Sequence, residues 1–317
     1  MTTSSHTIET VPVTTMSTGF ELAITVHRLV GAKPGPTLVL FGGIHGDEAM
    51  GVEAVRRSVQ AIDLEELSGT VIAVPVANPF SYETMTRHTV SDGLNLNRIF
   101  PGDAGGSITE QLAAKLITIL AGADFFIDFH SSGLYSTVDY AYVHDNGRQM
   151  SEAYGTPLLY HHDSYPGSAT DWALQQGIGA MVSELGGGGQ LSESFLDRAV
   201  AGTQNVLRAL GMKEGEVVTG PEQTVMKTLI TLKPKFGGFL LSDYEPETLG
   251  TTVPGGTVLG RVVSPYTFET LEELVAPYDS TIIVLTRDSF TRVAPGDYGF
   301  MVGDGTTTAT FSEEFGA

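Results

Sequence analysis

Residues 36–48 read PTLVLFGGIHGDE, and both the fold and the candidate site are built around this stretch. The run from Pro36 to Phe41 is apolar and β-branched, and two glycines follow it. This pattern predicts a buried strand that ends in a tight turn. His45 and Glu48 come directly after the turn, three residues apart. Open α/β sheets bind their ligands at the carboxyl ends of strands, so a site is expected here.

The chemistry of these side chains indicates a metal. Imidazole and carboxylate groups are good zinc ligands, and a catalytic zinc needs three protein ligands beside an open position. Residues 125–133, FFIDFHSSG, supply a third candidate, His130, at the end of another apolar strand. The chain has no cysteine, which excludes disulfides and thiolate ligands. Each part of the pattern has an alternative interpretation when taken alone. His45 and Glu48 could be a pair on the surface of a helix, and His130 could be a hydrogen-bonded loop residue.

Two further motifs complete the pattern: residues 87–102, RHTVSDGLNLNRIFPG, and residues 183–189, SELGGGG. In this order the four segments resemble the succinylglutamate desuccinylase/aspartoacylase family, a branch of the zinc carboxypeptidase superfamily. The resemblance covers residues 35–210 and, more loosely, the C-terminal third. The Asn-Leu-Asn-Arg form, with an arginine ten residues before its second Asn, is most similar to the branch containing N-acetyl-diaminobutyrate deacetylase. Aspartoacylases typically carry Asp at the position of Asn95, which weakens an aspartoacylase assignment.

The resemblance assigns roles to the metal ligands and to one glutamate. It implies that His45, Glu48 and His130 hold one zinc ion per chain. It also implies that Glu184 is the catalytic glutamate, a general base that accepts the proton of the attacking water. Glu184 ends an apolar strand and precedes four glycines, which allow backbone and substrate to approach closely. A solvated glutamate at a strand end is the alternative.

The resemblance also assigns a substrate-binding role to the segment around Asn97. Asn97 and Arg98 correspond to the pair that binds the substrate carboxylate, and a guanidinium fork suits that group because it pairs in a bidentate manner. Arg87 corresponds to the arginine near the scissile carbonyl, where it would stabilise the oxyanion. Structural salt bridges are the alternative for both arginines.

Several other polar residues have more than one interpretation. Asn95 and Asp128 are each candidates to orient a metal-bound imidazole through its second nitrogen, and Asp128 is also readable as a buried structural acid. Asp47 is expected to cap the helix that begins near Glu48. Four other histidines lack a ligand partner at a recognisable spacing and are interpreted as structural or pocket residues: His88, His144, His161 and His162.

The order of elements predicts an α/β fold. Residues 1–34 suggest an antiparallel edge. Expected strands then alternate with expected helices: strands 37–42, 70–76, 124–129, 138–143 and 179–184, and helices 48–61, 107–120, 168–177 and 191–210. Alternation of this kind indicates a sheet with helices on its faces, and the resemblance implies a mixed sheet like that of zinc carboxypeptidases. Ser107 to Glu110 form a capping-box pattern, and Gly211 stands at a helix C-cap position.

The character of the chain changes after residue 212. Short β-prone runs separated by Gly- and Pro-rich turns predict a smaller all-β domain. We therefore expect a catalytic α/β domain at 1–214 and a C-terminal β domain at 215–317. The second resembles the sandwich-like domain of the family, which is similar to lipoyl carrier domains. Lys227 lies at its start and is interpreted as a surface lysine that is not lipoylated.

Composition narrows the functional classes. The 317 residues are 41% hydrophobic, have a mean hydropathy of +0.07 and carry a net charge of −20. The acidic balance argues against nucleic-acid and anionic-membrane partners. No apolar run approaches the ~20 residues of a membrane span, and the N-terminus lacks a signal-peptide pattern, so a cytoplasmic location is expected. A homo-oligomer is left open.

Together these observations predict an enzyme. The resemblance implies a zinc-dependent hydrolase that cleaves the amide bond of a small N-acyl amino acid, with such a small molecule as its partner. A metallocarboxypeptidase acting on short peptides would use the same residues. A non-catalytic binding protein with this fold is a third hypothesis, against which the complete set of His45, Glu48, His130 and Glu184 argues.

Overall fold

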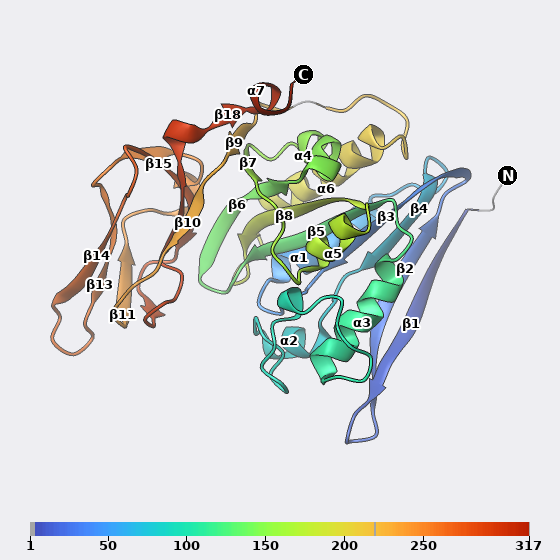
Figure 1. The fold of residues 1–317 in the computed structure, drawn as a ribbon, viewed down its shortest axis with the longest axis horizontal. Coiled ribbons are helices and arrows are strands. Elements are labelled where there is room, and N and C mark those ends of the chain that lie inside the picture. Colours follow the sequence, from blue (N-terminus) through green and yellow to red (C-terminus); the bar gives the residue numbers. More distant parts are fainter. Residues whose placement is uncertain (1–3, 219, 317) are drawn as a thin grey trace.

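A long mixed sheet forms the centre of the molecule in the computed structural model, which describes residues 4–218 and 220–316 (Figure 1). The strands of this sheet lie in the order β1-β2-β4-β3-β5-β8-β6-β15-β17-β10. Those before residue 210 are β1 (Ser5–Thr15), β2 (Glu21–Val30), β3 (Lys33–Gly42), β4 (Ser68–Val74), β5 (Phe125–Ser132), β6 (Ser136–Val143), β7 (Leu158–His161) and β8 (Gly179–Gly187). Strands β4, β3, β5 and β8 are parallel to one another. Strands β1 and β2 run antiparallel to their neighbours, and β6 is antiparallel to β8 but parallel to β7.

Helices cover both faces of the parallel strands. They are α1 (Ala49–Gln60), α2 (Pro79–Thr84), α3 (Ile108–Leu120), α4 (Arg148–Tyr154), α5 (Ala169–Gln175) and α6 (Glu193–Ala209). Helices α1, α4 and α6 pack with Leu38 and Leu40 of β3, and α3 and α5 pack with Val39 and Phe41 on the opposite face. Successive side chains of a strand point to opposite faces, so a strand buried on both sides is a continuous apolar run. This explains why residues 38–41 lack alternation.

The sheet register brings the ends of three strands together. Gly42 at the end of β3 pairs with Phe129 of β5, and His130 pairs with Glu184 of β8. The loop that carries His45 therefore leaves β3 beside the segment that carries His130. The two expected strand-end positions meet at one edge of the sheet.

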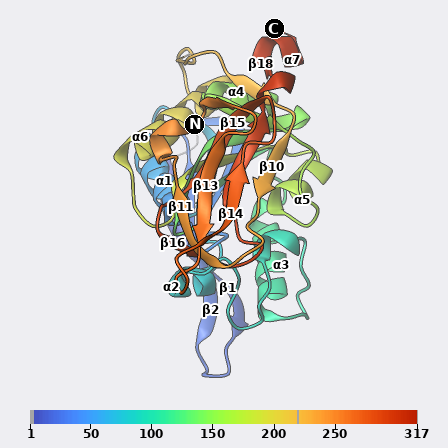
Figure 2. The same ribbon diagram turned by 90° about the vertical axis from the view of Figure 1, so that its left-hand side faces the viewer.

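The C-terminal region adds a small sheet and extends the large one. Its elements are β9 (Thr224–Met226), β10 (Leu229–Leu232), β11 (Gly238–Ser242), β12 (Thr252–Pro254), β13 (Val258–Val263), β14 (Thr270–Val275), β15 (Ser280–Arg287), β16 (Thr291–Val293), β17 (Phe300–Asp304), β18 (Ala309–Thr310) and α7 (Phe311–Phe315). Strands β14-β13-β11-β16 form an antiparallel sheet, which faces the viewer in Figure 2. It packs Leu240, Leu259 and Val262 against Ile283 and Phe300 of the long sheet.

Pairing of β15 with β6 continues the long sheet across the boundary near residue 214. Arg287 pairs with Ser136 in this ladder, so a residue of the C-terminal region lies beside β6. The expected division into an α/β domain at 1–214 and a β domain at 215–317 stays a prediction. Lys227 forms an ion pair with Glu314, 2.7 Å between Nζ and Oε2.

The α/β architecture, the antiparallel edge and the small C-terminal sheet are confirmed, and the expected helices and strands are present within a few residues. The capping box at Ser107 and Glu110 is formed, and Gly211 follows α6 with φ +68°. The expectation for Asp47 was wrong: the N-cap of α1 is Glu48, and no side chain caps it. Among the described residues, the helices are all too short or too polar to cross a membrane.

Candidate metal and catalytic site

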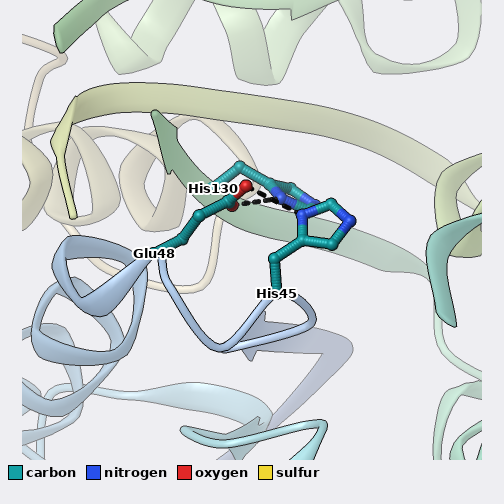
Figure 3. A group of neighbouring side chains, drawn as sticks. All are labelled: His45, Glu48 and His130. Carbon is teal, nitrogen blue, oxygen red and sulfur yellow. Dashed lines mark hydrogen bonds and ion pairs between the residues drawn. The ribbon is translucent and has the colours of Figure 1, made fainter. Parts of the chain in front are cut away.

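Two glycines shape the loop between β3 and α1. Gly43 adopts φ +62°, a conformation that side chains other than glycine rarely tolerate. Gly46 lies so close to α2 that a Cβ atom there would stand 1.8 Å from the carbonyl oxygen of Ser81. The backbone can therefore turn sharply between His45 and Glu48, and both side chains point to the same place (Figure 3).

His45, Glu48 and His130 form a buried cluster. One donor atom from each lies within 4.8 Å of the others, and the three residues are 2–3% exposed. The Glu48 carboxylate lies between the two rings, with Oε1 2.8 Å from His45 Nδ1 and Oε2 2.7 Å from His130 Nδ1 (Figure 3). Two nitrogen donors and one carboxylate are the ligand types of a catalytic zinc site. The cluster could hold a metal ion.

The second nitrogen of each imidazole also has a partner. His45 Nε2 lies 3.0 Å from Asn95 Oδ1, an amide oxygen that can only accept. A proton on Nε2 would satisfy that oxygen and leave the lone pair of Nδ1, which faces Glu48 Oε1, for a metal ion. His130 Nε2 lies 3.0 Å from Asp128 Oδ2 and 3.2 Å from Asn97 Nδ2. The Asp128 contact has the distance of an ion pair but not hydrogen-bond geometry, since neither carboxylate oxygen has a hydrogen-bond partner among the described residues.

The charges in the cluster depend on one another. Burial would raise the pKa of Glu48, but the neighbouring His45 and His130 outweigh it and hold the pKa well below its usual value. Burial, followed by the charge of Arg87, lowers the pKa of His45 to about 4. Burial also acts to lower the pKa of His130, but Asp128 and Glu48 raise it well above its usual value. A metal ion requires an ionised carboxylate, as the lowered pKa of Glu48 provides, and neutral imidazoles, so metal binding would displace the proton that the raised pKa of His130 favours.

Glu184 lies next to the cluster on the sheet. It pairs with His130 across β5 and β8, and it lines the same cavity. Burial raises its pKa to about 8. Gly186 follows with φ +71°, where the register between β5 and β8 shifts after His130. Glu184 is thus a carboxyl group beside the cluster but outside its three members. A general base needs this position, near a metal ion without being one of its ligands.

The arginines have different surroundings. Arg87 Nη1 donates to Glu48 Oε1 at 2.9 Å and lies 3.3 Å from His45 Nδ1. The salt-bridge interpretation of Arg87 therefore agrees with its contacts in the structure. Arg98 forms no ion pair among the described residues, and its guanidinium lies 5.1 Å from the ring centroid of Tyr165. Asn97 is anchored, because its Oδ1 accepts from the backbone of Ala169 at 3.0 Å.

A cavity of about 590 Å³ connects these groups, a size typical of small-molecule sites. All seven residues assigned to the site from the sequence line it: His45, Glu48, Arg87, Asn97, Arg98, His130 and Glu184. Asn95 and Asp128 are not part of this lining. Each lies 3.0 Å from the Nε2 of one ring of the cluster, and Asn95 Oδ1 also accepts from the backbone N–H of Asn97 at 2.9 Å.

Sequence reasoning missed part of the lining. Tyr140 and Tyr142 come from β6, Tyr165 from the loop before α5, and Arg287 and Tyr298 from the C-terminal region. The alternation of residues 138, 140, 142 and 144 was a usable signal, because residues two apart share one face of a strand. Nothing local indicates Arg287, whose place follows from the distant pairing of β15 with β6.

Comparisons with known proteins give a consistent result. Residues 34–210 match the family described as the succinylglutamate desuccinylase/aspartoacylase catalytic domain. The chain is 31% identical over 247 residues to the N-alpha-acetyl-L-2,4-diaminobutyric acid deacetylase of Halomonas elongata, covering 72% of this chain and 70% of the relative.

Solved structures show the same fold. The product-bound ectoine utilization protein EutE of Ruegeria pomeroyi is 25% identical, with a TM-score of 0.82 and 95% of each chain covered. A succinylglutamate desuccinylase/aspartoacylase from Rhodobacter sphaeroides is 24% identical, with a TM-score of 0.82 over 94% of this chain and 95% of that one. At this identity the second likeness bears on the fold alone.

Proposed function

Because the chain belongs to the succinylglutamate desuccinylase/aspartoacylase family, we propose that it is a zinc-dependent hydrolase that removes a short acyl group from the nitrogen of a small amino acid. One observation carries the proposal: the buried cluster of His45, Glu48 and His130 shares a cavity with Glu184, a carboxyl group outside the cluster. Three ligands of this type with an adjacent base suit metal-assisted hydrolysis.

In this proposal the metal is one zinc ion per chain. When bound, zinc polarises the scissile carbonyl and lowers the pKa of water. His45 and His130 would bind it through Nδ1, and Asn95 holds the His45 ring by accepting from Nε2. Zinc is preferred over harder cations because two of the three donors are imidazole nitrogens.

Glu184 is the proposed proton carrier. Its carboxylate accepts a proton from the attacking water and donates it to the leaving amine, so that the C–N bond breaks without expelling an unstable anion. Arg87 is the only arginine of the described chain in contact with the cluster, and we assign it to the developing negative charge on the carbonyl oxygen. Its present partner Glu48 would bind the metal instead.

Asn97 and Arg98 are proposed to bind the carboxylate of the substrate. The Arg98 guanidinium lines the cavity and has no carboxylate partner among the described residues. A fork of N–H donors without an acid partner is suited to a free α-carboxylate. Asn97, held by the Ala169 backbone, fixes the position of that segment.

The shape of the cavity favours a small substrate. Arg287 and Tyr298 of the C-terminal region are part of its lining, and Arg287 donates to the carbonyl oxygens of Tyr298 and Arg292 at 3.0 Å each. A cavity of about 590 Å³ suits one amino acid and a short acyl group better than an extended peptide. The partner is therefore a small N-acyl amino acid, and the carboxypeptidase hypothesis is less well supported.

A substrate screen tests this function. Zinc-loaded protein is incubated with acetyl-, formyl- and succinyl-amino acids, with dipeptides of matched side chains, and with amidated forms of each. We expect hydrolysis of an acyl-amino acid with a free carboxylate to be fastest. A clear preference for dipeptides would move the protein to the carboxypeptidase hypothesis, and hydrolysis of neither class would support a binding protein.

A further inference from the structure

The cavity continues from the metal cluster onto strands of the C-terminal region. Val138 of β6 pairs with Leu285 of β15, Leu285 pairs with Met301 of β17, and Met301 pairs with Thr231 of β10. Directly paired residues of antiparallel strands point to the same face of a sheet. All four side chains line the cavity. Because neighbouring strands lie about 4.8 Å apart, these residues extend roughly 14 Å across the sheet.

This part of the lining is apolar and partly open to the cavity. Val138 and Leu285 are 2% exposed and form its base. Met301 and Leu229 are only partly buried, and Leu229 lies two residues before Thr231, on the same face of β10. The four apolar side chains pack in one cluster and all line the cavity. We call Val138, Leu229, Leu285 and Met301 the apolar row.

The apolar row has a definite place relative to the proposed reaction. The Arg98 guanidinium, the proposed carboxylate-binding group, lies 5.1 Å from the ring centroid of Tyr165. Tyr165 meets Tyr142 edge-on, with ring centroids 6.0 Å apart. Tyr140 pairs with the proposed base, Glu184. Residues two apart on a strand share a face and lie about 7 Å apart. Along β6 the order is therefore carboxylate site, reaction centre, apolar row.

An N-acyl amino acid has the same order of groups. Its carboxylate lies on one side of the scissile amide and its acyl chain on the other. A substrate with its carboxylate at Arg98 and its amide at Glu184 therefore directs the acyl chain toward Val138 and the rest of the apolar row. Apolar surface that is partly open to a cavity gains stability when an apolar group covers it.

The charged side chain beside the apolar row is already engaged. Arg287 lies two residues after Leu285 on β15 and also lines the cavity. Its guanidinium donates to Thr291 Oγ1 at 3.1 Å and to the carbonyl oxygens of Tyr298 and Arg292 at 3.0 Å each. Each of its three nitrogens thus has a protein acceptor. A carboxylate at the end of an acyl chain would have to compete with these acceptors, whereas an uncharged chain would not.

We propose that the apolar row is the acyl subsite and that it accepts an unbranched, uncharged acyl chain of four to six carbons; this assignment rests on the proposed function. An extended chain advances about 1.2 Å per bond, so a hexanoyl chain reaches roughly 6 Å beyond its carbonyl carbon. That length carries it past Leu285 toward Met301. An acetyl group reaches only the start of the row. The substrates are thus N-butyryl to N-hexanoyl amino acids.

An acyl series tests the subsite. The amino acid that ranks first in the substrate screen is prepared with acetyl, butyryl, hexanoyl and succinyl groups, and kcat/KM is measured for each. Burying one methylene group can raise kcat/KM about fourfold. We expect a rise of about tenfold or more from acetyl to hexanoyl, less than the full gain of four methylenes because the row covers one side of the chain. Butyryl should also exceed succinyl, which has the same number of carbons and a terminal carboxylate.

Variants on two separate strands locate the effect. Met301→Gln places an amide on the row at similar length and should reduce the ratio of kcat/KM for hexanoyl over acetyl about fivefold, whereas Met301→Leu should retain the ratio. Leu229→Asn should also reduce it. The matched control is Ile230→Asn, because Ile230 is the next residue of β10, points to the opposite face, is 37% exposed and does not line the cavity. This control should leave the ratio unchanged.

Binding separates failure of the subsite from failure of the proposed reaction. Calorimetry of the Glu184→Gln variant with N-acetylglycine and N-hexanoylglycine needs no turnover. We expect about tenfold tighter binding of hexanoylglycine, and most of this difference should disappear when Met301→Gln is added. If the wild type hydrolyses no member of the series but this preference is found, the proposed reaction fails and the subsite stands.

Three results would overturn the subsite. The first is equal kcat/KM and equal affinity for acetyl and hexanoyl compounds. The second is a preference for succinyl over butyryl, which would assign the acyl end to a cationic group such as Arg287. The third is a hexanoyl preference that survives both Met301→Gln and Leu229→Asn.

Discussion

Replacing His130 with alanine should abolish the stabilisation that zinc confers on this protein. Donor atoms of His45, Glu48 and His130 lie within 4.8 Å of one another, and Glu48 contacts both rings. Removing His130 leaves one nitrogen and one carboxylate, and two ligands rarely hold zinc. The loss should therefore be almost complete.

The size of the effect follows from linkage. A ligand that binds only the folded chain, at 1,000 times its Kd, adds about 4.1 kcal/mol to the free energy of unfolding. At about 2.1 cal/mol/K per residue, 317 residues have an unfolding entropy of about 0.67 kcal/mol/K, so zinc should raise the Tm of the wild type by about 6 °C. In His130→Ala we expect a rise below about 1 °C.

Differential scanning calorimetry with and without zinc measures both values. Each variant is compared with its own metal-free form, so that a change in the stability of the metal-free chain cancels. His161→Ala is the matched control, because His161 pairs with Glu314 on the surface and does not line the cavity. An equal rise in Tm for wild type and His130→Ala would refute the ligand assignment.

Three further predictions follow from separate contacts. Arg98→Lys should raise KM for acyl-amino acids with little change in kcat, because lysine lacks the bidentate fork, and an unchanged KM in steady-state kinetics would remove Arg98 from the carboxylate site. Gly46→Ala should lower the free energy of unfolding by about 1–3 kcal/mol, since its Cβ would lie 1.8 Å from the Ser81 carbonyl oxygen; urea unfolding beside Gly105→Ala, where the new Cβ meets only a side chain at 3.6 Å, checks this. Burial lowers the pKa of His144 from 6.5 to about 4, so between these values the unfolded chain binds a proton that the folded chain does not, and stability falls as the pH falls. The loss attributable to His144 should reach up to about 3 kcal/mol, and urea unfolding at pH 7 and pH 5 should show a smaller fall in His144→Asn than in wild type.

Much of the fold was predictable because its signals are local. The run at residues 36–41 identifies a buried strand, and the Ser107 to Glu110 box identifies the start of a helix that the structure contains. The metal candidates are readable for the same reason, since His45 and Glu48 share one loop and His130 ends a strand. Strand order places them together through the parallel pairing of β3 with β5.

The rest depends on contacts between distant parts of the chain. Asp47 has the sequence position of a helix cap, yet its Oδ1 lacks a hydrogen-bond partner among the described residues, because the loop turns one residue later. Arg287 reaches the cavity only because β15 adds to β6. His144 lacks a recognisable ligand spacing, and its bond to the His162 carbonyl is evident only from the structure.

Turnover of the Glu184→Gln variant tests the central claim most directly, namely that Glu184 moves the proton in a metal-assisted hydrolysis of an N-acyl amino acid. The measurement is kcat on the best substrate of the screen, with the zinc content of each sample determined in parallel and Glu152→Gln as a surface control. We expect one zinc per chain in both variants and a kcat roughly 10²–10⁴-fold lower in Glu184→Gln alone, the usual contribution of a positioned general base. Normal turnover by Glu184→Gln with its zinc retained would contradict the claim and assign the proton transfer to another group.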